Sequence, residues 1–246
     1  MRLRIKFSSE EKEFRLPIHY NEIIQGFIYR HLSPSLAEKI HNQGFVDPET
    51  GKKFKFFTFS RLIPETKPII QKNSIIFKSP VNLIITSVNT NFIQSLVENL
   101  LTNPEVKLFN QKVILSSVEV LPLPIDKNFF RIRTLSPVTV YTTFNTRDGK
   151  KKTHYYAPYE DAFKEGLIQN LMAKVRALTG KNPVNKIKIT PLGKLKEKVV
   201  IYKNFVIKGW DGEFEIKGEP EILKIALLSG LGAKNSAGFG CVEILR

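Results

Sequence analysis

Residues 229–240 read Ser-Gly-Leu-Gly-Ala-Lys-Asn-Ser-Ala-Gly-Phe-Gly, and this glycine-rich stretch does more than any other to decide the fold. Four glycines within eleven residues predict a backbone that turns sharply or closely approaches another molecule, because glycine alone adopts positive φ without steric cost. The stretch follows a helical pattern at 219–228 and precedes a strand-like pattern at 241–245. Dinucleotide-binding and Walker loops run from a strand into a helix, so both are excluded.

The centre of this loop holds Lys234, Asn235 and Ser236, between Gly232 and Gly238. Such a loop can present a cation and several backbone N–H groups to a polyanion. A tight connection in an ordinary fold is the alternative, and the glycines alone do not decide between the two. The choice rests on the remainder of the chain.

The charge of the chain predicts a protein that binds nucleic acid. The 246 residues include 38 basic and 23 acidic side chains, and the formal net charge of +15 concentrates polyanions around the protein. Residues 1–125 contribute +5 (16 basic, 11 acidic) and residues 126–246 contribute +10 (22 basic, 12 acidic), so we expect the second half to carry more of the binding. A lysine-rich surface that serves only solubility is the rival interpretation.

Apolar content and cysteine usage indicate an unprocessed cytoplasmic protein. A hydrophobic content of 42% can build one large domain or two smaller ones. No run of about 18 apolar residues predicts a membrane span or a signal core, so we expect no membrane association. Cys241 is the single cysteine, which excludes an internal disulfide and a cysteine-based zinc site. No cluster of His, Asp and Glu has metal-ligand spacing, so we expect neither a metal nor another cofactor.

The first half of the chain predicts a mixed order of strands and helices. Residues 2–7 alternate basic and apolar side chains, as a half-buried strand does, and Asn21 and Asn89 are placed to cap helices. The predicted strands lie at 2–7, 54–60, 74–78, 81–87 and 113–121, and the predicted helices at 21–32, 34–44 and 90–101. This is a β-α-β-β-α-β order with a helical insertion, which is the ferredoxin-like arrangement.

The order of elements repeats after a short stiff boundary, Pro-Leu-Pro at 122–124. The predicted strands of the second half lie at 129–134, 138–144, 187–190, 199–201, 205–209 and 241–245, and the predicted helices at 159–178 and 219–228. The fold class that follows is α+β, with two tandem ferredoxin-like (RRM-like) β-α-β-β-α-β domains at 1–123 and 124–246 and the glycine-rich loop near the C-terminus.

The glycine-rich pattern and several shorter segments resemble the RAMP superfamily of CRISPR-associated proteins, most closely the endoribonuclease that processes CRISPR precursor RNA. The resemblance covers nearly the whole chain, including the basic first strand and the segments at 25–29, 36–41, 55–60, 103–106, 135–138 and 238–240. It implies tandem ferredoxin-like domains. It also implies cleavage of repeat RNA without a metal, in which the 2′-hydroxyl attacks the adjacent phosphodiester and leaves a 2′,3′-cyclic phosphate and a 5′-hydroxyl.

The same resemblance implies three catalytic residues, because Tyr29, His41 and Lys55 stand where the family's catalytic tyrosine, histidine and lysine lie. The reaction needs a base near the 2′-hydroxyl, an acid near the departing 5′-oxygen and a cation for the phosphorane, and these side chains can supply them. Which of the tyrosine and the histidine acts as base stays open. Each residue also has a simpler interpretation, as a packed ring, a cation at a helix C-terminus and a solvated lysine.

Basic residues of the second half indicate a surface for RNA. Alternating positions on two strands can place their side chains on one face, where they follow phosphates. The candidate RNA-binding residues are Arg131, Arg133, Lys186, Lys188, Gly232, Lys234, Asn235, Ser236 and Gly238. The expected partner is CRISPR repeat RNA within precursor CRISPR RNA, with subunits of a CRISPR interference complex as further partners, and the protein is expected to be a monomer or a homodimer.

Two other functions stay open at this point. A non-catalytic RAMP subunit would bind guide RNA inside an interference complex and never cut it. Tyr29 together with His41 favours the enzyme, because a scaffold needs no acid–base pair. A generic RNA-binding protein with tandem RRM-like folds is the third candidate, but neither half has a clear aromatic RNP pattern.

Overall fold

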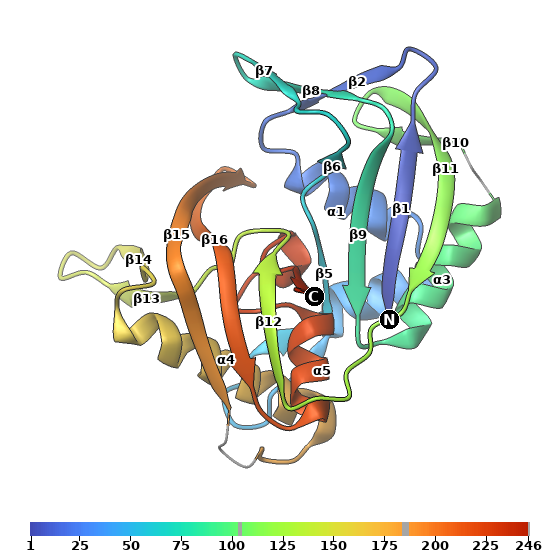
Figure 1. The fold of residues 1–246 in the computed structure, drawn as a ribbon. Helices are drawn as coiled ribbons and strands as arrows, with labels where there is room; N and C mark the ends of the chain where they lie inside the picture. The colour runs from blue at the N-terminus through green and yellow to red at the C-terminus, as the bar shows by residue number, and fades with distance from the viewer. Residues whose placement is uncertain (103–104, 184–186, 246) are drawn as a thin grey trace.

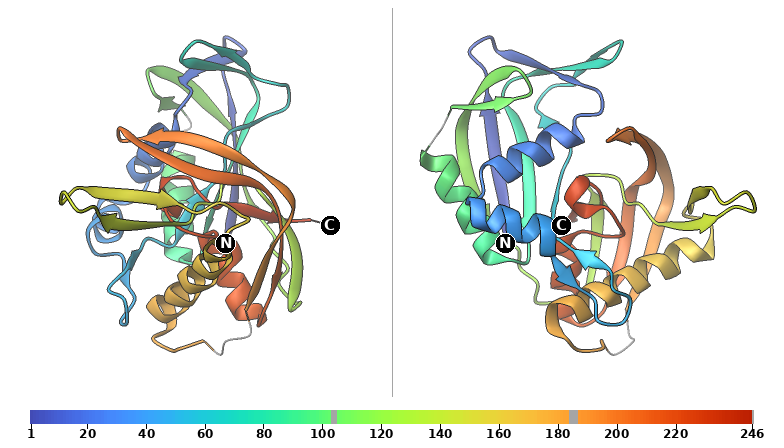
Figure 2. Two further views of the ribbon diagram at one scale, coloured as in Figure 1. Left: turned by 90° about the vertical axis from the view of Figure 1, so that its left-hand side faces the viewer. Right: turned by 180° about the vertical axis from the view of Figure 1, so that it is seen from behind.

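Two β-sheets, one from each half of the chain, stand side by side in a sheet-dominated α+β fold (Figure 1). The computed structural model describes residues 1–102, 105–183 and 187–245. In the view from behind, α1 (Asn21–Arg30) and α4 (Asp161–Thr179) both lie on the face toward the viewer (Figure 2). No helix within the described ranges is long and apolar enough to cross a membrane.

The first sheet is built from the N-terminal half. Its strands run in the order β10 (Glu105–Leu108), β11 (Gln111–Leu121), β1 (Arg2–Ser8), β9 (Val81–Ser87) and β5 (Phe57–Phe59), and β6 (Ile63–Pro64) also pairs with β9. The alternation predicted at 2–7 is confirmed, because Leu3, Ile5 and Phe7 are fully buried. The apolar sides of α1 and α3 (Thr90–Thr102) pack into the same core.

The single strand predicted at 54–60 is wrong. β4 (Lys53–Phe54) pairs with β3 (Phe45–Val46), whereas β5 pairs with β9, and Lys55 and Phe56 lie in the break between the two strands. Phe56 adopts φ +54°, and its side chain joins the core of the C-terminal half. The run of aromatic residues has the composition of a strand, but the chain changes its pairing partner in the middle of the run.

A smaller three-stranded sheet projects beyond the first sheet, at the top of Figure 1. It pairs β8 (Ser74–Lys78) with β2 (Glu13–Pro17) on one side and with β7 (Ile69–Gln71) on the other. The strand predicted at 74–78 is therefore confirmed, but it lies outside the main sheet.

The helices of the first half end close to the predicted positions, and one predicted cap is wrong. α2 (Pro34–Glu38) continues directly into a π-helical turn, η1 (Lys39–Gln43), which ends at Gly44 with φ +61°. Asn21 does not cap α1, because it is already the first helical residue. Its side chain donates instead to two carbonyls of the glycine-rich loop, 2.9 and 3.2 Å away.

The second sheet is built from the C-terminal half, in the order β15 (Lys188–Tyr202), β16 (Phe205–Lys217), β12 (Phe129–Thr134) and β17 (Val242–Ile244). The separate strands predicted at 187–190 and 199–201 are one long strand, β15. Lysines and a glycine interrupt its apolar pattern, yet the pairing with β16 continues through a shift of register. α4 and α5 (Pro220–Ser229) pack into the core beneath this sheet.

A separate hairpin of β13 (Tyr141–Asn145) and β14 (Lys151–Tyr155) projects from the second half (Figure 1). The strand predicted at 138–144 is thereby corrected. Val138 forms only an isolated bridge with Trp210, and the chain enters the hairpin three residues later.

Each half has its own apolar core, and a buried ion pair joins the two halves. Arg176 on α4 donates two hydrogen bonds of 2.8 Å to the carboxylate of Asp47, and the guanidinium also lies 3.3 Å from Glu49. The hydrogen bonds from Arg176 hold the pKa of the Asp47 carboxyl well below its usual range. Because the pair is buried and doubly bonded, it fixes the turn before β4 and hence the start of the segment that carries Lys55.

Candidate functional site

The three candidate catalytic residues lie together, although they come from three different elements. Tyr29 lies in the last turn of α1, His41 in η1, and Lys55 in the break between β4 and β5. The rings of Tyr29 and His41 meet edge-on with centroids 5.8 Å apart, and Lys55 Nζ lies 5.4 Å from the centroid of the Tyr29 ring. A phenol, an imidazole and an ammonium group are thus within reach of one small ligand group.

Tyr29 contributes a hydroxyl that has no hydrogen-bond partner. Its oxygen is shielded from solvent and bonds to no group among the described residues. Burial raises the pKa of Tyr29 above its usual value, and the neighbouring Tyr202 adds to the shift. A shielded polar atom without a partner costs about 1–3 kcal/mol, so few persist in folded proteins without a functional reason. The hydrogen-bonding capacity of this hydroxyl is thus unused among the described residues.

His41 and Lys55 flank this ring in different environments. His41 is exposed, and its Nδ1 lies 2.9 Å from Oδ1 of Asn42, which orients the imidazole. Lys55 is half-buried, and burial together with the charge of Lys203 lowers its pKa. Within the described ranges, no carboxylate lies within 4.0 Å of the Lys55 ammonium group. This cation is therefore available to an anion from outside the protein.

The glycine-rich loop has a backbone conformation that favours glycine at four positions. The φ angles are +85°, +64°, +83° and +72° at Gly230, Gly232, Gly238 and Gly240. Asn235 holds the loop closed, because its side chain donates to the carbonyls of Leu231 and Phe239 over 3.0 Å each. Its amide nitrogen is thus already bonded within the loop.

Both halves of the chain hold this loop in place. From the N-terminal half, Asn21, Gln25 and Thr58 donate to its carbonyls over 2.6–3.2 Å. From the C-terminal half, Lys174 of α4 donates to two more of its carbonyls, over 2.6 and 3.2 Å. Lys174 is almost completely buried, and burial lowers its pKa to about 7. The loop is therefore a rigid connection between the two halves.

We expect Gly240→Ala to destabilise the protein strongly, because a Cβ at this position would lie 1.9 Å from the carbonyl oxygen of Leu231. The free energy of unfolding should fall by at least about 3 kcal/mol, as for other severe backbone clashes. Gly180→Ala is the matched control, since Gly180 also has a positive φ, +69°, but open space around it. It should lose only about 1 kcal/mol. Urea unfolding measures both, and equal losses would show that the loop tolerates the clash.

A basic groove of about 740 Å³ runs beside the loop and reaches Lys55. Its walls include α4, the segment 52–57, the segment 139–143 and the loop residues 232–236. The lysines that line it are Lys52, Lys53, Lys55, Lys234 and the internally bonded Lys174, against one carboxylate, that of Glu165. Lys234 Nζ lies 4.8 Å from the centroid of the Tyr141 ring, which also lines the groove. Cations beside accessible aromatic rings suit the phosphates and bases of single-stranded nucleic acid.

The sequence identified only part of this groove. Of the predicted RNA-binding residues, the loop members Gly232, Lys234, Asn235 and Ser236 line it, while Gly238 is buried against Phe59. Lys52 and Lys53 were missed although they stand in a visible basic run. The signal for Lys174 is subtler: it occupies an apolar position of its helix, seven residues after the buried Leu167 and three after the buried Leu171.

The predicted residues on the strands lie elsewhere. Arg131 and Arg133 of β12 are exposed and form ion pairs with Glu215 and Glu243, and they do not line the groove. Lys188, at the start of β15, is exposed and does not line it either. Lys186 lies outside the described residues.

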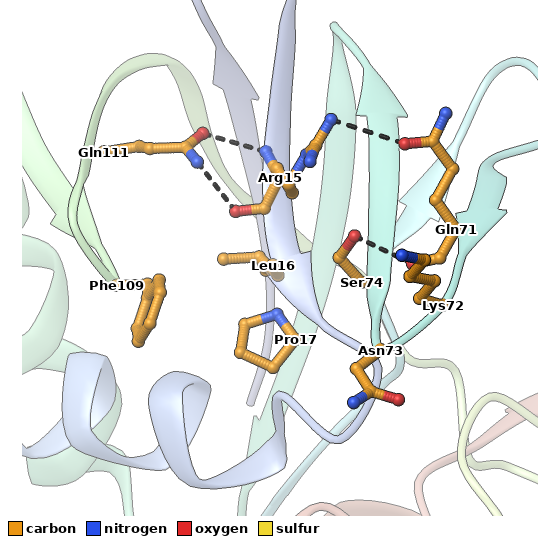
Figure 3. Close-up of a pocket in the computed structure, with 9 residues that line it drawn as sticks. All are labelled: Arg15, Leu16, Pro17, Gln71, Lys72, Asn73, Ser74, Phe109 and Gln111. Atoms are coloured by element: carbon orange, nitrogen blue, oxygen red, sulfur yellow. Dashed lines mark hydrogen bonds between the residues drawn. The ribbon is translucent and has the colours of Figure 1, made fainter.

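A second pocket, of about 800 Å³, lies between the small three-stranded sheet and the beginning of β11 (Figure 3). Gln111 braces it by bonding to both the N–H and the carbonyl of Arg15, over 2.8 and 2.9 Å. Arg15 and Lys72 are the charged residues that line it, and none of the candidate catalytic or RNA-binding residues is among its walls. The described part of the chain contains no group of three His, Cys, Asp or Glu side chains that could hold a metal ion.

Family models match both halves of the chain. The model described as "CRISPR associated protein Cas6, C-terminal" matches residues 118–244, and the one described as "CRISPR-associated protein Cas6, N-terminal" matches residues 15–119. Among curated proteins, the chain is 28% identical to "CRISPR-associated endoribonuclease Cas6 1" of Methanocaldococcus jannaschii, over 98% of this chain and 92% of that protein. It is also 28% identical to "CRISPR-associated endoribonuclease Cas6" of Pyrococcus furiosus, over 99% and 90% of the two chains.

Solved structures agree with these matches. A structure of "CRISPR associated protein Cas6" superposes with a TM-score of 0.82 at 28% identity, covering 100% of this chain and 99% of the other. A second, of a Cas6-related gene product from Pyrococcus furiosus, superposes with a TM-score of 0.86 at 26% identity, covering 100% and 98%. The similarity thus extends over both halves and over the junction between them.

Proposed function

This chain belongs to the Cas6 family of CRISPR-associated proteins, and on that premise we propose that it is an endoribonuclease that cleaves CRISPR precursor RNA within its repeats. The observation that carries the proposal is the convergence of Tyr29, His41 and Lys55, of which Lys55 also lines the basic groove. The curated relatives from Methanocaldococcus jannaschii and Pyrococcus furiosus, which are named endoribonucleases, support the same activity.

The proposed reaction cleaves one phosphodiester with two proton transfers, one from the attacking 2′-hydroxyl and one to the departing 5′-oxygen. The 2′-hydroxyl attacks the adjacent phosphorus, which forms a 2′,3′-cyclic phosphate, and the bond to the 5′-oxygen breaks. His41, exposed beside the site, takes the proton from the 2′-hydroxyl. Tyr29 gives its proton to the departing 5′-oxygen, because its raised pKa keeps the phenol protonated at neutral pH and the departing alkoxide is the stronger base. Lys55 stabilises the negative charge of the phosphorane.

The basic groove is the proposed path of the RNA beyond the cleaved bond. Along this path would lie the groove residues Lys52 and Lys53 and the loop residues Gly232, Lys234, Asn235 and Ser236. Gly238 would support these loop residues from within the fold. Arg131, Arg133 and Lys188 would then contact RNA on a separate surface of the C-terminal half. The proposal that binding depends more on the second half than on the first is supported by the net charges of the two halves, +10 against +5, although three of the five groove lysines come from the first half.

The ferredoxin-like character of each half is also a proposal, with the boundary between 1–123 and 124–246. If the strands of each half are numbered along a β-α-β-β-α-β unit, both sheets run in the order 4-1-3-2, as β11-β1-β9-β5 and as β17-β12-β16-β15. The helices α1 and α3, and α4 and α5, stand at the two helix positions of these units. The separate cores of the halves support the same division.

The experiment that tests the function is cleavage of repeat RNA in excess EDTA. We expect cleavage to continue, since Tyr29, His41 and Lys55 supply an acid, a base and a cation without a metal. The 5′ fragment should end in a 2′,3′-cyclic phosphate and the 3′ fragment in a 5′-hydroxyl, which end-specific labelling distinguishes. Loss of cleavage that magnesium restores would contradict the mechanism. RNA that is bound but never cut under either condition would identify a non-catalytic guide-RNA subunit instead.

A further inference from the structure

The long hairpin of β15 and β16 brings a C-terminal element next to the three candidate catalytic residues. Its turn consists of two residues, Lys203 and Asn204, both with positive φ, +48° and +64°. Just before the turn, the hydroxyl of Tyr202 donates a hydrogen bond to the side-chain oxygen of Gln25 on α1. Gln25 in turn donates to the carbonyl of Ser236 in the glycine-rich loop, over 2.6 Å. The turn is therefore held against the N-terminal half, one helical turn from Tyr29.

Lys203 adds a cation at the end of the hairpin that is held against α1. Its Nζ lies 5.8 Å from the centroid of the Tyr202 ring, and its charge is near enough to affect the titration of Lys55. Among the described residues, no carboxylate lies within 4.0 Å of either ammonium group. Burial, and after it the charge of Glu22, raises the pKa of Tyr202. Two neighbouring cations repel each other, and an anion between them removes that repulsion.

Two residues near the candidate site adopt a positive φ although they are not glycine. Phe56, which follows Lys55, and Lys203 both adopt positive φ, +54° and +48°. The positive φ of Lys203 is the ordinary conformation of a two-residue hairpin turn, whereas that of Phe56 lies in the break between β4 and β5. The turn holds the backbone of Lys203 beside α1, next to the Tyr202 that bonds to Gln25.

We propose that Lys203 is a further catalytic residue, which binds the scissile phosphate of the RNA together with Lys55. The proposal rests on the proposed endoribonuclease function. A phosphodiester carries one negative charge, and the phosphorane that forms from it carries more. Two ammonium groups at the phosphate therefore stabilise the transition state more than the bound substrate. The C-terminal half thus contributes directly to the chemistry, in addition to holding the RNA.

The test replaces Lys203 without disturbing the turn. Lys203→Gly removes the ammonium group and suits the positive φ, so the hairpin should remain folded. The single-turnover cleavage rate should fall about 10²-fold, whereas the Kd for repeat RNA should change less than about threefold. Lys203→Arg, which keeps the charge, should restore most of the rate.

A matched control is present in the chain. Lys72 is the first residue of another two-residue Lys-Asn hairpin turn, with φ +47°, far from the candidate site. Lys72→Gly should leave both the cleavage rate and the RNA affinity unchanged. Wild-type cleavage by Lys203→Gly would overturn the role of Lys203 and leave the proposed function intact. Absence of cleavage by the wild-type protein itself would instead reject the proposed function, and the role of Lys203 with it.

Discussion

A repeat RNA with a single 2′-deoxy nucleotide immediately 5′ of the scissile phosphate is expected to bind this protein and to remain uncut. The proposed reaction uses the 2′-hydroxyl of that nucleotide as its nucleophile, and Tyr29, His41 and Lys55 only move protons and stabilise charge. Removing the hydroxyl removes the nucleophile, so the cleavage rate should fall below detection. Affinity should hardly change, because phosphates and stacked bases supply most of the binding free energy of such an interface.

The measurement pairs single-turnover cleavage with a binding assay on the same RNA. The control is an RNA with the 2′-deoxy nucleotide two positions further 5′, which should be cut at the normal rate. Cleavage of the first RNA would mean that water is the nucleophile, and the roles given to the three residues would be wrong. A large loss of affinity would mean that the hydroxyl is a binding contact.

The second large effect is expected for His41→Ala, with a loss of about 10²-fold or more in the single-turnover rate and little change in the Kd for RNA. His41 is exposed and its one hydrogen bond, to Asn42, is local, so its removal should leave the fold intact. His154→Ala is the control, because His154 is also exposed but lies on the β13–β14 hairpin and does not line the groove. A wild-type rate for His41→Ala would assign the proton transfer to another group.

The sequence predicted the order of the elements well, because hydrophobic periodicity and terminal signals are local properties. The helices α4 and α5 lie within two residues of the predictions, and the buried side of β1 follows the predicted alternation. The errors occur where tertiary contacts override the local pattern. The strand at 54–60 breaks because Phe56 is buried in the core of the other half, and Asn21 bonds to a loop more than 200 residues away instead of capping its helix.

The candidate site was predicted only in part, because tertiary contacts also determine which residues lie in it. Tyr29, His41 and Lys55 were identified from a resemblance to a family, and the structure brings them together, while their roles stay predictions. Lys203 could not be identified in this way, because its position relative to α1 depends on the register in which β15 pairs with β16. The length of β15 and the shift in its pairing with β16 determine where the turn lies, and the interrupted apolar pattern conceals both.

The attachment of the glycine-rich loop to α1 has a consequence for biosynthesis. The hydrogen bond from Gln25 to Ser236 joins residues 211 positions apart, so a ribosome needs on the order of 10–40 s between making one and the other. The core of the N-terminal half can form during that interval, and with it the contact between Tyr29 and His41. The segment that carries Lys55 is fixed only later, when Arg176 and the core around Phe56 are present. The groove still lacks α4, the loop and the hairpin that carries Lys203. A nascent chain therefore holds part of the proposed chemistry without the surface that delivers RNA to it, and cleavage has to await synthesis of α4, the hairpin and the loop.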